Sequence, residues 1–96
     1  MHPGDRVRFA IETAKAVLDD RLPAAEGAPA VVMQAEQVTP LLRGDRDSVT
    51  RSESETVATQ LRLLAEQVND HGSGRADTSD YTAMAKALGE MAQTLR

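Results

Sequence analysis

Two histidines, His2 and His71, are the side chains of this sequence best suited to proton transfer near neutral pH. We assign no role to His2, which lies in an expected frayed terminus. His71 stands at the expected end of a helix, where a histidine commonly caps the last carbonyls and interacts well with the helix dipole. No motif ties a serine or threonine nucleophile to it. We therefore expect no catalytic residue, and a helical-bundle enzyme that uses His71 is kept as an alternative.

Metal sites need two or more ligands at a defined spacing, and the common patterns are missing. The sequence has no cysteine, no His-Glu-x-x-His and no Glu-x-x-His, which excludes thiolate zinc sites and gives no zinc-protease or di-iron signature. Asp45, Arg46 and Asp47 begin like a calcium loop, but Thr50 replaces the glycine of the sixth position and Arg46 would repel the cation. We expect no metal and no cofactor.

Other residues that could take part in catalysis or carry a group also lack the necessary partners. Asp19 and Asp20 are neighbours in the sequence and point apart on a helix, so they do not form a catalytic pair. Glu53 and Glu55 are typical of negative charge at a helix N-terminus. There is no glycine-rich phosphate-binding motif, and the surroundings of Ser48 do not resemble a site for a prosthetic group.

The charge balance argues against nucleic acid as a partner. Fifteen acidic and eleven basic residues give a net charge of −4. The expected third helix carries Arg51 and Arg62 among several glutamates, so it does not have the basic character of a DNA-recognition helix. We expect no nucleic-acid binding by this chain.

The apolar residues of the sequence favour a soluble, cytoplasmic protein. No apolar run approaches the roughly 18 residues that a membrane span needs, so no membrane partner is expected. Residues 1–6 contain no apolar segment of a secretory signal. Abundant alanine and a preference for arginine over lysine suggest a GC-rich bacterial genome.

Apolar residues recur at helical spacing in four segments, which predicts helices at about 5–22, 29–43, 52–71 and 78–95. Pro23 is expected to end the first helix and to begin a linker of small residues, 23–28. Pro29 then suits the first position of the second helix. Pro40 would remove a bond to the Glu36 carbonyl, so this helix is expected to kink or end near Thr39, with at most one more turn to Gly44.

The last two helices have the clearest signals. Two overlapping capping boxes, Thr50 with Glu53 and Ser52 with Glu55, predict the start of the third helix, and Gly72 is expected to cap its end. The apolar stripes of the two helices are Val57, Leu61, Leu64 and Val68, followed by Tyr81, Met84, Leu88, Met91 and Leu95. Gly89 lies off the second stripe, costs helix stability, and could mark close approach of another backbone.

No strand pattern competes with the helices, so we expect an all-α protein with one domain over residues 1–96. Short connections favour an antiparallel four-helix bundle, possibly completed or extended by dimerisation. The core is poor in aromatic side chains, and association is a common remedy in small domains.

Phe9, Met33 and Leu63 lie off the apolar stripes of their helices. At about 100° per residue, Phe9 falls roughly opposite the stripe of Val7, Ile11 and Leu18. Met33 falls roughly opposite the stripe of Val31, Ala35 and Val38, and Leu63 falls well to the side of its own stripe. Single exposed apolar side chains are ordinary, so they need have no role. The functional interpretation is that these three residues bind a partner, either another copy of the chain or a different protein.

Three hypotheses of function follow. We favour a non-catalytic protein–protein interaction or assembly module that acts as a homo-oligomer or as a small subunit of a larger complex. One alternative is an acidic regulatory partner, such as an antitoxin, immunity protein or chaperone, whose negative surface covers a basic protein. The other is the enzyme with His71 described above.

Overall fold

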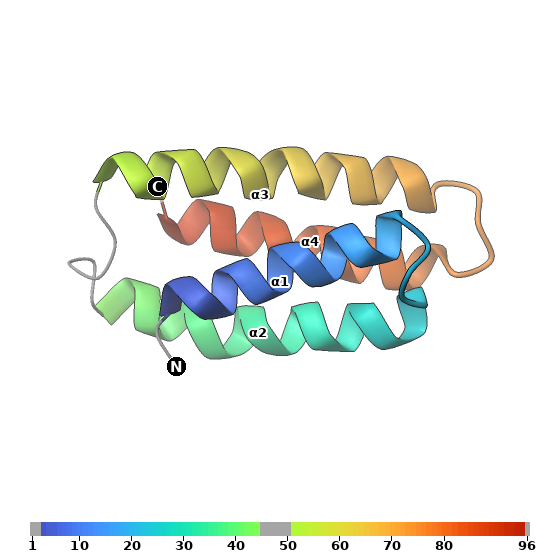
Figure 1. Ribbon diagram of the computed structural model, residues 1–96, viewed down its shortest axis with the longest axis horizontal. Coiled ribbons are helices and arrows are strands. Elements are labelled where there is room, and N and C mark those ends of the chain that lie inside the picture. Colours follow the sequence, from blue (N-terminus) through green and yellow to red (C-terminus); the bar gives the residue numbers. More distant parts are fainter. Residues whose placement is uncertain (1–2, 45–50, 96) are drawn as a thin grey trace.

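Four helices form an antiparallel bundle in the computed structural model (Figure 1). They are α1 (Pro3–Leu18), α2 (Ala24–Gly44), α3 (Arg51–Gly72) and α4 (Thr78–Leu95). The structure describes residues 3–44 and 51–95, with side chains described for 5–40 and 55–95. The described chain measures 41 × 21 × 18 Å and contains no strand, which confirms the expected all-α bundle.

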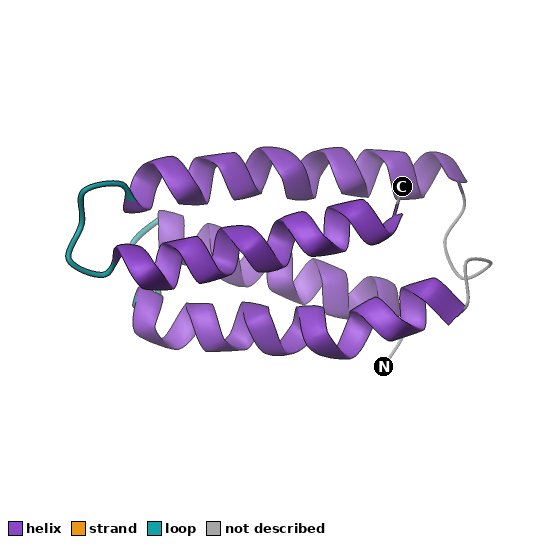
Figure 2. Ribbon diagram, turned by 180° about the vertical axis from the view of Figure 1, so that it is seen from behind, coloured by secondary structure: helices purple, strands orange, loops and turns teal. Residues whose placement is uncertain are grey.

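The helices do not pack equally on one another. α4 packs extensively against both α3 and α2, and α1 packs mainly against α2, with fewer contacts to α3 and α4. The α1–α2 and α3–α4 connections lie at the same end of the bundle (Figure 2).

The core contains most of the predicted α3 and α4 stripes, whose end residues Val57 and Leu95 are only partly buried, and alanine occupies many of the remaining inward positions. Small side chains let neighbouring helices approach closely, and the larger ones fill the space between them. The largest fully buried side chains are Leu61, Met84, Leu88, Met91, Val17, Val31, Val38 and Val68.

The first helix ends at Leu18, four residues before the expected boundary, because the chain closes it with a left-handed residue. Asp20 has φ of +61°. Its N–H donates to the Val17 carbonyl (3.2 Å), and the Arg21 N–H donates to the Ala16 carbonyl (2.9 Å). This is the hydrogen-bond pattern of a Schellman cap, in which glycine usually takes the left-handed position. Asp20 therefore holds the cap with a side chain that disfavours the conformation.

Replacing Asp20 with glycine is expected to raise the free energy of unfolding by about 0.5–1 kcal/mol, because glycine adopts a positive φ without steric cost. Urea denaturation measures the change. Asp20→Ala is the matched control, because it removes the negative charge from the helix C-terminus and keeps the Cβ atom that disfavours a positive φ. Equal gains in the two variants would contradict the conformational explanation and assign the effect to charge.

The second helix begins at Ala24, so the prediction of a linker up to Ala28 was wrong. The Pro23 carbonyl accepts the first hydrogen bonds, from the N–H groups of Glu26 (3.0 Å) and Gly27 (2.9 Å). Ala24 and Ala28 are buried and continue the spacing of Val31. The core face of this helix thus starts with alanines, whose small side chains resemble linker composition.

α2 runs through Pro29 and Pro40 to Gly44, so Pro29 is not its first residue, and the further turn expected after Pro40 is present. Both prolines are exposed, so water can reach the carbonyl groups whose helical hydrogen bonds they remove. The buried positions Val31 and Val38 lie between them. Burial of this face offsets the cost of the prolines.

The third and fourth helices agree with their predicted ranges within one residue at each end. Gly72 belongs to α3 itself, and the left-handed residue of the following turn is Gly74, with φ of +80°. Several sequence predictions lie outside the described residues or side chains: those for His2, Ser48, the Asp45–Asp47 segment and both capping boxes.

Candidate functional site

The three candidate partner-binding residues are exposed to solvent. Phe9, Met33 and Leu63 expose 50%, 47% and 53% of their surface, respectively. The structure thus confirms that these side chains lie outside the core. Their role in binding a partner remains a prediction.

These three side chains do not form one cluster. Phe9 belongs to α1, Met33 to α2 and Leu63 to α3, and each lies away from the buried face of its helix. The contacts place α2 and α3 at opposite corners of the bundle, because α4 packs between them. The outer faces with Met33 and Leu63 therefore point apart, and one small partner surface would not cover both.

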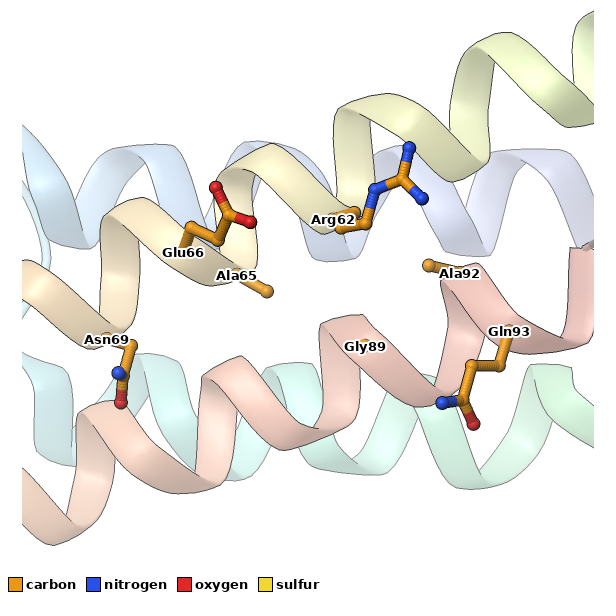
Figure 3. Close-up of a pocket in the computed structure, with 7 residues that line it drawn as sticks. All are labelled: Arg62, Ala65, Glu66, Asn69, Gly89, Ala92 and Gln93. Carbon is orange, nitrogen blue, oxygen red and sulfur yellow. The ribbon is translucent and has the colours of Figure 1, made fainter.

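A groove of about 320 Å³ runs between the outer sides of α3 and α4 (Figure 3). Its floor is made of Ala65, Gly89 and Ala92, which have little or no side chain. A Cβ atom built on Gly89 would meet no atom of the chain within 4 Å. Packing within this chain therefore does not explain the glycine inside α4.

Polar side chains surround this groove. Arg62 and Glu66 extend from α3, and Asn69 and Gln93 lie at opposite ends of the groove (Figure 3). All four are exposed. Neither Arg62 nor Glu66 forms an ion pair with another described residue. The sequence did not reveal this site, because it depends on which faces of α3 and α4 lie side by side.

His71 is part of a cluster that fixes the connection between α3 and α4. Its ring centroid is 5.4 Å from that of Tyr81, and Arg75 lies over the Tyr81 ring at 5.6 Å. The Arg75 Nη1 atom is 3.4 Å from His71 Nε2, so it can donate a hydrogen bond to the neutral ring. Arg75 also forms an ion pair with Asp77, at 3.5 Å. These contacts join the helix end to the turn and give His71 a structural role.

Gly72 lies directly against Tyr81. A Cβ atom at Gly72 would overlap the Cβ and Cγ atoms of the tyrosine. Both residues are buried. The glycine is therefore required for close approach of α3 and α4, and not for the left-handed cap expected from the sequence.

A partly exposed polar contact joins α1 to α2. Arg6 Nη1 donates to Gln34 Oε1 at 3.4 Å and also to Gln37 Oε1. Gln34 is only 8% exposed, and Arg6 Nε is buried without a hydrogen-bond partner. The sequence gave no indication of this contact, since it depends on the register of the two helices.

The described side chains give no support for a metal centre, because no group of three potential ligands occurs among them. The helices of the described chain are also too short or too polar to cross a bilayer. No protein-family model, no curated protein and no solved structure matches the chain.

Proposed function

We propose that this protein is a non-catalytic interaction or assembly module that binds other proteins through the outer faces of its helices. The observation that carries the proposal is the exposure of Phe9, Met33 and Leu63, each on an otherwise regular amphipathic helix. A bundle of this kind needs only one apolar face on each helix. A partner chain would cover the additional apolar surface.

The expected energy of one contact is modest. Burial of a whole side chain of this size contributes about 1.5–3 kcal/mol, so covering its exposed half contributes roughly 1 kcal/mol and changes an affinity about fivefold. Phe9 is the strongest candidate because it has the largest apolar area. Leu63 comes next because its exposed neighbours Gln60 and Gln67 are polar and uncharged. The bacterial and cytoplasmic setting stays a prediction from composition.

Aspartate at a contact position is expected to weaken association, because the charge would have to lose its hydration. Sedimentation of the wild type is compared with that of Phe9→Asp, Met33→Asp and Leu63→Asp at micromolar concentration. We expect the wild type to be an oligomer and at least one variant to dissociate. Ser73→Asp adds the same charge in the exposed turn between α3 and α4, outside the faces that carry the three side chains, and should leave the assembly intact.

A monomeric wild type would leave only a different protein as the partner. In that case, proteins retained by the wild type from a host extract are compared with those retained by the three variants. Loss of the same protein from at least one variant, with retention by Ser73→Asp, supports the proposal. An oligomer or a bound protein that all three variants retain would contradict the role of these three side chains, because they would then be ordinary surface and the chains would meet elsewhere.

A further inference from the structure

We propose that the groove between α3 and α4 binds a second copy of this chain, which is related to the first by a two-fold axis. This inference rests on the proposed function in taking a protein as the partner, and it goes further by naming that partner and its position. It depends on three properties of the groove, which are its floor, its charges and its symmetry.

The floor permits close approach by another helix. Ala65 and Gly89 are half-buried, Ala92 is buried, and the space above Gly89 is open. With so little side chain on the floor, a helix of the second copy can approach the backbone of α4 closely.

The charges around the groove of one copy are complementary to the same charges of a second copy. Arg62 and Glu66 are four residues apart on α3, both extend from the same side of the groove, and neither is paired with another described residue. A two-fold axis across the middle of the groove, perpendicular to α3, reverses the order of the two residues in the second copy. Arg62 of each copy then faces Glu66 of the other. An isologous interface requires this reciprocity.

The amide side chains follow the same symmetry. Asn69 and Gln93 lie at opposite ends of the groove (Figure 3). The same axis brings Asn69 of one copy opposite Gln93 of the other, and each amide can both donate and accept hydrogen bonds. The polar rim therefore surrounds the small apolar floor, which is the usual arrangement of a protein interface.

The test uses charge reversal in the full chain, followed by sedimentation equilibrium. Arg62→Glu places two glutamates opposite each other at each contact, and Glu66→Arg places two arginines there. We expect each single variant to raise the dimer dissociation constant by about tenfold or more, because like charges then meet at the interface. An equimolar mixture of the two variants should form a heterodimer as tight as the wild-type dimer, since opposite charges face each other again.

A second variant tests the floor independently of charge. Gly89→Gln places a long side chain in open space on a helix, where glutamine is a better helix former than glycine, so the variant should fold. It should dimerise at least about tenfold more weakly than the wild type, because the side chain fills the groove. Circular dichroism confirms that the helical content is unchanged.

Each other outcome overturns the groove interface. A wild type that is monomeric at its highest soluble concentration excludes the second copy. A dimer that tolerates Gly89→Gln and both charge reversals is formed elsewhere. Single variants that weaken the dimer without recovery in the mixture show that the charges act within one chain. If Phe9→Asp or Met33→Asp dissociates a dimer that these groove variants leave intact, the groove fails and the proposed function stands.

Discussion

Replacing Leu88 with alanine is expected to lower the free energy of unfolding by about 2–5 kcal/mol. Leu88 is 0% exposed in the middle of α4, the helix that packs on both α2 and α3. Alanine would leave a cavity between α4 and its neighbours α2 and α3. These helices cannot all move inward to fill it, because each is held by its other contacts. Urea denaturation followed by circular dichroism measures the loss, with the slope of the transition checked for two-state unfolding.

The matched control is Leu63→Ala, which makes the same chemical change on the exposed side of α3. We expect it to change the free energy of unfolding by less than about 0.5 kcal/mol in the monomer. Comparable losses in the two variants would contradict the burial of the α4 stripe. The comparison therefore separates the core from the candidate partner surface.

Replacing Gly72 with alanine is expected to lower the free energy of unfolding by about 3 kcal/mol. The new Cβ atom would overlap the Cβ and Cγ atoms of Tyr81, which lie too close to the backbone of α4 to move independently of that helix. Relief requires the ends of α3 and α4 to separate, which also disturbs the contacts of Tyr81 with His71 and Arg75. Thermal unfolding and urea denaturation measure the effect.

Gly89→Ala is the control for this prediction, since it makes the same substitution inside a helix where the added atom meets nothing. We expect it to raise the free energy of unfolding of the monomer by about 1 kcal/mol, because alanine is the better helix former. The two glycines should therefore respond with opposite signs. A loss at both positions would show that the surroundings of Gly89 are crowded.

The sequence predicts α3 and α4 well because several independent signals coincide there. The stripe of Leu61, Leu64 and Val68 is regular, and Asp80 provides the negative charge expected in the first turn of α4. Large apolar side chains at regular spacing leave little freedom in the choice of the buried face. The ranges consequently agree within one residue.

The start of α2 could not be predicted in the same way, because the buried positions of its first turns are occupied by alanine. Ala24 and Ala28 extend the buried face, but alanine is common on both sides of helices and in linkers. The prolines at positions 29 and 40 also resemble boundaries when only local preferences are considered. Burial of the face between them depends on the other helices, which local spacing does not describe.

One part of the candidate site could be predicted from the sequence, and the other part could not. The off-stripe positions of Phe9, Met33 and Leu63 follow from helical geometry, so their exposure was predictable. The groove around Gly89 is formed by two helices together. The residues that surround it could therefore not be predicted from the spacing within either helix. The spacing placed Gly89 off the stripe, and only the structure shows that the space beside it is empty.

The unequal packing of the helices implies an unequal resistance to local opening. α1 is held chiefly by α2, whereas α4 is enclosed by two neighbours. Detaching α1 would expose its interface with α2 and its smaller contacts with α3 and α4, and would leave the contacts of α4 with α2 and α3 in place. The backbone amides of α1 should therefore exchange with solvent through a partial opening of low free energy, and those of α4 only when the whole bundle unfolds.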